Sequence, residues 1–193
     1  MIAIINYGVG NLFSLESSFN AIGQAVKVTS DAEDLERADR IILPGVGAFE
    51  DAAKKLKSSG LDEPLLDEVK KGKPILGICL GMQLLFEKSF EFGEHEGLNL
   101  IPGTVRYIGE VVPVGLKIPQ IGWNSLHKKH EGEYVYFVHS YAAFCDEKFV
   151  TSTTDYGAEL TAAVQNKNVY GVQFHPEKSG NVGLNILREF CNV

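Results

Sequence analysis

The sequence has few cysteines and no long hydrophobic run, and both shortages narrow the class of protein. The three cysteines, Cys79, Cys145 and Cys191, have the spacing of neither a zinc site nor a disulfide framework. No apolar stretch approaches the roughly 20 residues that cross a bilayer. The N-terminal MIAIINYGVGN has neither the positive segment nor the cleavage site of a signal peptide. We therefore expect a cytoplasmic protein with no metal, no other cofactor and no membrane segment.

Basic residues are also scarce. The chain has 18 basic and 25 acidic side chains, a formal net charge of -7, and no basic stripe that could follow a phosphate backbone. We therefore do not expect nucleic acid as a partner. The length of 193 residues and the 45% hydrophobic content suit one core, so we predict a single domain over residues 1–193.

The first half of the chain alternates apolar runs with longer periodic stretches, which is typical of strand and helix units on a parallel sheet. Helices are expected from Asn11 to Gly23, from about residue 48, and over LGMQLLFE directly after Cys79. The strands that alternate with them are predicted at 2–5, 25–29, 40–43 and 74–79.

The second half has shorter candidate strands, which we interpret as a partly antiparallel extension of the sheet. They lie at 103–107, 134–138, 149–154, 160–165 and 169–174. A C-terminal helix is expected over residues 181–191, because Leu184, Leu187 and Cys191 share one face. The polar stretch 87–99 is predicted to be a mobile loop.

The strongest catalytic signal surrounds Cys79. Gly77-Ile78-Cys79-Leu80-Gly81 joins a predicted strand to a predicted helix, as a thiol counterpart of the G-x-S-x-G nucleophile elbow. Flanking glycines allow so tight a turn, and the unpaired N–H groups of the helix favour the thiolate. The Leu80 N–H is placed to stabilise an oxyanion. A lone cysteine in an apolar run is usually a small core side chain, but glycines on both sides favour the nucleophile.

A base and its orienter are predicted near the other end of the chain. His175-Pro176-Glu177 follows the predicted strand VYGVQF, and residues i and i+2 of an extended segment project to the same side. The carboxylate would then align the imidazole for proton transfer with the nucleophile. Taken alone, His-Pro-Glu is more often an ordinary turn, so it indicates a catalytic pair only in combination with the predicted nucleophile Cys79. His139 is the second choice for the base.

Two further segments suit the same chemistry. Backbone N–H groups of Val46 and Gly47, in a glycine-rich turn between a strand and a helix, could complete an oxyanion hole. Gln83 lies four residues after Cys79, on the same helix face, and could offer a donor and an acceptor to a bound amide. A turn without chemistry and a solvent-facing glutamine are the alternative readings.

The motifs G-I-C-L-G-M-Q at 77–83 and F-H-P-E at 174–177 resemble those of the triad-type class I glutamine amidotransferase family. This resemblance implies a flavodoxin-like, mostly parallel sheet with helices on both faces. It also implies that Cys79 forms a thioester with glutamine and releases ammonia with a proton from His175, which Glu177 aligns. Oxyanion roles for Leu80 and Val46, and substrate contacts for Gln83, Ser140 and Tyr141, follow from the same resemblance.

Six longer blocks between residues 5 and 180 are similar to the glutaminase subunits of imidazole glycerol phosphate synthases in histidine biosynthesis. They are INYGVGNLFSL, LPGVGAFEDA, LIPGTV, KIPQIGWN, YFVHSYA and GVQFHPEKSG. The similarity implies a heterodimer with a cyclase subunit, an eight-stranded β/α barrel that receives the ammonia and makes imidazole glycerol phosphate plus an aminoimidazole carboxamide ribotide. Asn11, Trp123, Tyr136 and Lys178 stand in blocks that resemble the docking surface.

Three other functions remain open from the sequence. The first is the small subunit of anthranilate or aminodeoxychorismate synthase, which shares the triad but should lack the INYGVGNL and PQIGWN blocks. The second is a non-catalytic binding module on the same fold, which the intact Cys79, His175 and Glu177 disfavour. The third is a thiol peptidase or gamma-glutamyl hydrolase with the same elbow.

Overall fold

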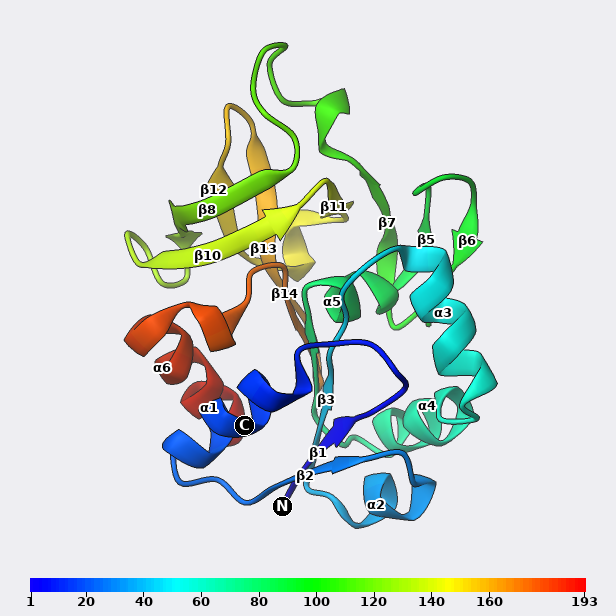
Figure 1. The fold of residues 1–193 in the computed structure, drawn as a ribbon. Helices are drawn as coiled ribbons and strands as arrows, with labels where there is room; N and C mark the ends of the chain where they lie inside the picture. Colours follow the sequence, from blue (N-terminus) through cyan, green and yellow to red (C-terminus); the bar gives the residue numbers. More distant parts are fainter.

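An eight-stranded sheet runs through the centre of the computed structural model, which describes residues 1–193 (Figure 1). Its first five strands are parallel, in the order β2-β1-β3-β4-β14, and the remaining three, β13-β12-β9, are antiparallel. The prediction of a mostly parallel sheet with a partly antiparallel extension is therefore confirmed. The strands are β1 Ile2–Ile5, β2 Val26–Thr29, β3 Arg40–Leu43, β4 Ile75–Ile78, β9 His127–Lys128, β12 Val150–Asp155, β13 Glu159–Asn166 and β14 Val169–Val172.

Helices cover both faces of this sheet, as predicted. Alternate residues of a strand point to opposite faces, so Ala3 and Ile5 of β1 join one apolar core with helices α2 to α5, while Ile2 and Ile4 join the core under α1 and α6. None of the helices is long and apolar enough to cross a membrane. The helices are α1 Leu12–Ala21, α2 Ala32–Arg37, α3 Phe49–Ser58, α4 Asp62–Lys70, α5 Leu80–Leu84 and α6 Gly180–Cys191.

Above the central sheet, a four-stranded sheet and a two-stranded hairpin surround the carboxyl ends of the parallel strands (Figure 1). The four-stranded sheet has the order β11-β7-β5-β6, and β8 pairs with β10 in the hairpin. The bounds are β5 Phe86–Ser89, β6 His95–Glu96, β7 Ile101–Tyr107, β8 Gln120–Ser125, β10 Tyr134–His139 and β11 Tyr141–Phe144. Short 3₁₀ turns complete the chain at η1 Ile108–Glu110, η2 Glu147–Phe149 and η3 Pro176–Lys178.

Two predictions about residues 80–99 are wrong. The helix after Cys79 ends at Leu84, three residues before the predicted end, and the predicted loop 87–99 contains most of β5 and all of β6. The reason is tertiary pairing, because residues 86–89 pair with β6 on one side and with β7 on the other. Phe86 packs into the core beneath α3 and α4.

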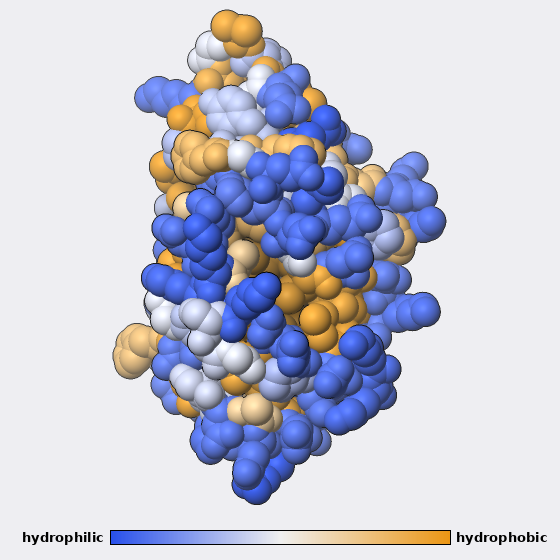
Figure 2. Space-filling model, turned by 90° about the vertical axis from the view of Figure 1, so that its right-hand side faces the viewer, coloured by the Kyte–Doolittle hydropathy of each residue, from blue (hydrophilic) through white to orange (hydrophobic).

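The face of the molecule that carries α3 is mostly hydrophilic, with hydrophobic side chains visible in a hollow near its middle (Figure 2). Helix α3 contributes to the hydrophilic part of this face because it is amphipathic. Phe49, Ala52 and Leu56 are buried against the core, whereas Lys54 and Glu50 pair on the solvent side. The helix thus covers the β3 and β4 side of the sheet and leaves its amino end near the carboxyl ends of these strands.

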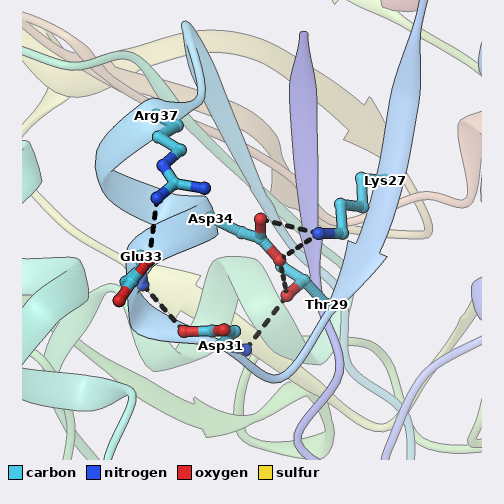
Figure 3. Close-up of polar contacts among 6 residues, drawn as sticks. All are labelled: Lys27, Thr29, Asp31, Glu33, Asp34 and Arg37. Carbon is cyan, nitrogen blue, oxygen red and sulfur yellow. Dashed lines mark hydrogen bonds and ion pairs between the residues drawn. The ribbon is translucent and has the colours of Figure 1, made fainter.

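A buried carboxylate joins the short helix α2 to β2 (Figure 3). Asp34 accepts hydrogen bonds from Lys27 Nζ and Thr29 Oγ1, and Thr29 Oγ1 accepts one from the Asp31 N–H. Asp31 in turn caps α2 by accepting from the Glu33 N–H. The hydrogen bonds from Lys27 and Thr29 hold the pKa of Asp34 below its ordinary value, despite the opposing effect of burial.

The lowered pKa of Asp34 predicts a specific pH dependence of stability. A carboxyl whose pKa is depressed by folding stabilises the protein above its unfolded pKa, and that contribution is lost as pH falls through the folded pKa. Asp34→Asn should therefore lower the free energy of unfolding at neutral pH, and the deficit should shrink below about pH 4. Urea unfolding at a series of pH values measures this. Glu33→Gln, in an exposed pair with Arg37, is the control, and a deficit independent of pH would contradict the prediction.

Candidate active site

Cys79 stands at a sharp turn between β4 and α5. Its backbone has φ 55° and ψ -113°, a conformation that residues with a side chain rarely adopt. A Cβ at Gly81 would lie 1.9 Å from the Leu43 carbonyl oxygen, and one at Gly77 would lie 2.6 Å from the Gly81 carbonyl oxygen. Both positions therefore require glycine, which is the physical reason for the glycines that flank the cysteine in the sequence.

The turn places the sulfur of Cys79 in a pocket of about 290 Å³ at the carboxyl end of the sheet. This volume suits a small metabolite better than a peptide. The pocket also contains His175, so the sequence-distant pair lies on the same side of the molecule. Because α5 has only five residues, its dipole is smaller than the sequence suggested. The free N–H groups of its first turn are therefore the main groups that favour a negative charge at this end of the helix.

His175 and Glu177 form a buried pair. His175 Nδ1 lies 2.8 Å from Glu177 Oε1, and both side chains are almost inaccessible to solvent. Pro176–Lys178 is a 3₁₀ turn, so the predicted extended i, i+2 geometry is wrong although the contact it was meant to explain is present. Main-chain bonds fix the imidazole: the His175 N–H donates to the Tyr136 carbonyl, and Ser179 Oγ donates to the His175 carbonyl.

The pair makes His175 unusually basic. Burial lowers the pKa of His175, but the interactions with Cys79 and Glu177 together outweigh burial and raise it to about 9. His175 Nε2 is buried and has no hydrogen-bond partner among the other side chains, so it is directed to Cys79, whose hydrogen-bonding interaction and charge both raise the pKa of His175. An imidazolium beside a cysteine favours the thiolate, which is the reactive form.

His139 lies in the same pocket but is engaged elsewhere. Burial lowers its pKa to about 4, so the ring is neutral. Its Nδ1 is 2.8 Å from the Tyr141 carbonyl oxygen and its Nε2 is 2.9 Å from the Gln120 carboxamide. A neutral ring that donates from Nδ1 must accept at Nε2, and the Gln120 NH₂ group, otherwise without a partner, can supply that bond. The second choice for the base is therefore disfavoured.

The turn proposed as an oxyanion site lies against the elbow. Val46 and Gly47 line the pocket with Leu80, and a Cβ at Gly45 would lie 2.6 Å from the Gly81 nitrogen. Leu80 is the first residue of α5, so its N–H has no acceptor within the helix. The structure thus brings together the backbone segments that sequence reasoning selected for the oxyanion hole.

The predicted substrate residues also line the pocket, with one difference in role. Both Ser140 and Tyr141 border it. Gln83 uses its amide nitrogen inside the protein, donating to the Tyr141 carbonyl and to Gln173 Oε1 at 3.0 Å each. Only its carbonyl oxygen is left for a ligand, so the prediction that Gln83 offers both a donor and an acceptor is wrong.

Two residues of the site were missed from the sequence. Glu91 lines the pocket and accepts a hydrogen bond from the Phe49 N–H at the start of α3, but it falls in the stretch 87–99 that was predicted to be a loop. Burial raises the pKa of Glu91. Gln173 is fully buried next to Cys79, and the alternation of VYGVQF was the only signal that it faces inward.

Three of the four predicted docking residues form one cluster beside His175. Trp123 and Tyr136 meet at a ring distance of 6.2 Å across the β8–β10 hairpin, and Lys178 Nζ lies 5.8 Å from the Tyr136 ring centre. Asn11 starts α1, a helix that contacts η3. Phe13 on α1 and Ile121 on β8, neither selected from the sequence, are strongly exposed as well.

Comparisons with known proteins give one consistent result. A family model described as glutamine amidotransferase class-I matches residues 3–192. The imidazole glycerol phosphate synthase subunit HisH of Caldanaerobacter subterraneus subsp. tengcongensis is 50% identical over 200 residues, covering 98% of this chain and 97% of that protein. The protein of the same name from Exiguobacterium sibiricum is also 50% identical, covering 100% of this chain and 97% of its own length.

Solved structures show the same fold at lower sequence similarity. A crystal structure of a glutamine amidotransferase superposes with a TM-score of 0.80 at 18% identity and covers 100% of both chains. PurLQS from Thermotoga maritima gives a TM-score of 0.73 at 18% identity over 99% of this chain and 97% of that chain. These likenesses concern the fold alone.

The raised pKa of His175 predicts how its ring titrates. In the wild-type chain, NMR should find the ring titrating near pH 9. In Cys79→Ala the opposing effect of burial and the support of Glu177 remain, but the contribution of the sulfur is lost, so the midpoint should fall. His127, an exposed ring paired with Glu131, serves as the internal control. An unchanged His175 midpoint in Cys79→Ala would contradict the coupling.

Proposed function

Because the chain belongs to the class I glutamine amidotransferase family, we propose that it is the glutaminase subunit of imidazole glycerol phosphate synthase in histidine biosynthesis. Two observations support this proposal: the nearly end-to-end similarity to HisH subunits, and a cysteine in one pocket with a buried His–Glu pair. The second observation supports the glutaminase activity itself, because it supplies a nucleophile and a base. The full-length HisH similarity favours this subunit over the small subunits of anthranilate or aminodeoxychorismate synthase and over a thiol peptidase.

In the first half-reaction, the Cys79 thiolate attacks the side-chain carboxamide carbon of glutamine. The carbonyl oxygen takes up the negative charge and receives hydrogen bonds from the N–H groups of Leu80 and of the Val46–Gly47 turn. The intermediate collapses when His175, as imidazolium, gives the Nε2 proton to the departing amine. Ammonia leaves, and a thioester between Cys79 and the glutamyl group remains.

In the second half-reaction, the now neutral His175 accepts a proton from water, and the hydroxide attacks the thioester carbon. The same backbone N–H groups stabilise the second oxyanion, and collapse releases glutamate and restores the Cys79 thiolate with the His175 imidazolium. Glu177 holds Nδ1 through the 2.8 Å contact, so that Nε2 always faces the reacting centre.

Recognition of the amino acid uses the polar groups around the pocket. The free carbonyl oxygen of Gln83 accepts a hydrogen bond from glutamine, and the Glu91 carboxylate attracts the α-ammonium group. Ser140 and Tyr141, at the junction of β10 and β11, close the other side of the substrate. This set selects a free amino acid, since a glutamine inside a peptide lacks both the α-ammonium and the α-carboxylate charge.

The ammonia must reach a second catalytic site, because ammonia released into water mostly becomes ammonium, which has no lone pair for attack. We place that site in a separate cyclase subunit, a β/α barrel, that docks over the cluster of Trp123, Tyr136 and Lys178 together with Asn11. The exposed Phe13 gives this face the apolar, aromatic character of protein interfaces. We further propose that the heterodimer acts in the cytoplasm, where the three free cysteines stay reduced.

Removing the nucleophile separates the two activities of the complex. Cys79→Ala should lower glutamine hydrolysis by at least about 10³-fold, while the complex with the cyclase should still make product from ammonium salts. Cys145→Ala is the matched control, because burial raises the pKa of Cys145 to about 11 and makes its thiol a poor nucleophile. Glutaminase assays and cyclase assays with each nitrogen source measure this. Retained hydrolysis in Cys79→Ala would refute the assignment.

The docking face is tested by removing one exposed ring. Trp123 is 55% exposed and meets the Tyr136 ring edge to face, so Trp123→Ala should fold normally and weaken cyclase binding about tenfold or more. Phe90→Ala, which removes an exposed aromatic ring on the β5 side, is the control and should leave the affinity unchanged. Titration calorimetry gives both Kd values. Equal losses for the two variants would place the interface elsewhere.

A further inference from the structure

Gln173 has no part in the mechanism above, yet its polar side chain is fully buried at the heart of the site. It follows β14, two residues before His175, and its relative exposure is 0%. Burying a carboxamide is costly unless its groups are hydrogen-bonded. Gln173 meets this need between two residues of the active site: Gln83 on one side and the sulfur of Cys79 on the other.

The orientation of the Gln173 carboxamide is fixed by a chain of acceptors and donors. The Tyr141 carbonyl oxygen can only accept, so the Gln83 side chain must turn its NH₂ group toward it. The same NH₂ group then faces Gln173, whose carbonyl oxygen must accept at 3.0 Å. The opposite end of the Gln173 carboxamide, its NH₂ group, is therefore directed at Cys79 Sγ, 3.8 Å away.

We propose that Gln173 is a positioning residue that donates a hydrogen bond to the Cys79 sulfur and favours its reactive, anionic form. An N–H donor to a charged acceptor interacts more strongly with the thiolate than with the thiol. Water cannot replace this donor, because the Gln173 side chain is completely enclosed. This inference deepens the proposed function and rests on it, since it concerns the same nucleophile.

The arrangement also connects substrate binding with the nucleophile. Gln83, whose free carbonyl oxygen faces the substrate, holds the Gln173 carboxamide in the orientation that serves the sulfur. A residue that only anchored Gln83 would need an acceptor at position 173 and nothing more. The role at the sulfur requires an N–H group on the side of the carboxamide that faces Cys79, whereas the anchoring role does not. Substitution of Gln173 can therefore separate the two roles.

Gln173→Glu and Gln173→Met test these roles against each other. The glutamate keeps an oxygen for the Gln83 NH₂ group but replaces the donor at Cys79 with a carboxylate oxygen, whereas the methionine removes both groups without adding charge. If Gln173 serves the sulfur, reactivity falls in the order wild type, Met, Glu. If it only anchors Gln83, the methionine variant keeps the wild-type alkylation rate and its KM for glutamine rises instead.

The readout is the rate of Cys79 alkylation by iodoacetamide as a function of pH, in the full chain without substrate. We expect the midpoint of the profile to rise by about one pH unit in Gln173→Met and further in Gln173→Glu, with kcat at pH 7 reduced about tenfold in the first. The KM for glutamine in Gln173→Glu should stay near the wild-type value. The titratable groups around Cys79 are present in every variant, namely Tyr7, Glu91, His139, Tyr141 and His175.

Gln165→Met, the same loss of an amide on the exposed side of β13, is the control and should leave the alkylation profile unchanged. An unchanged profile in Gln173→Met, or a Gln173→Glu variant as reactive as wild type, would overturn the role of Gln173. Failure of the wild-type chain to hydrolyse glutamine would instead overturn the proposed function. The alkylation profile and the glutaminase assay thus distinguish the two failures.

Discussion

The whole site depends on the close approach of two backbone segments. The turn after β3 and the elbow after β4 touch through main-chain atoms, with Gly45 against the Gly81 nitrogen and Gly81 against the Leu43 carbonyl. Any side chain at either glycine would push the two strand ends apart. Because the sulfur sits on one segment and the Val46–Gly47 turn on the other, this contact sets the distance between the nucleophile and the groups that stabilise its product.

Charge in the pocket is arranged by burial and pairing together. His175 and Glu177 are removed from water and bonded to each other, and the interactions of His175 with Cys79 and Glu177 together let the imidazole carry a proton where burial alone would expel it. His139, equally buried but without a carboxylate, stays neutral. Two histidines of one pocket thus differ in charge because of their neighbours, and only one of them can deliver a proton to a leaving amine.

The sequence allowed the parallel sheet, the elbow and the His175–Glu177 pair to be predicted, because each depends on local spacing or on residue types that the turn requires. Glu91 was missed because it lies in the turn between β5 and β6, and these strands form only when β5 pairs with β6 on one side and with β7 on the other. The partners of Gln83 could not be foreseen either, since the Tyr141 carbonyl and Gln173 reach it only after two separate sheets have assembled. Local patterns contain no information on such distant pairings.

The two partners in proton transfer are attached to different parts of the molecule. The Cys79 N–H donates to the Val172 carbonyl within the parallel sheet, whereas the His175 N–H donates to the Tyr136 carbonyl of the hairpin. Ser179 Oγ also connects these two residues, because it accepts from the Tyr136 N–H and donates to the His175 carbonyl. A displacement of β10 would therefore reach the main chain of His175 directly, whereas Cys79 would keep its bond to the central sheet. The distance between the proton donor and the sulfur thus depends on how the hairpin packs against that sheet.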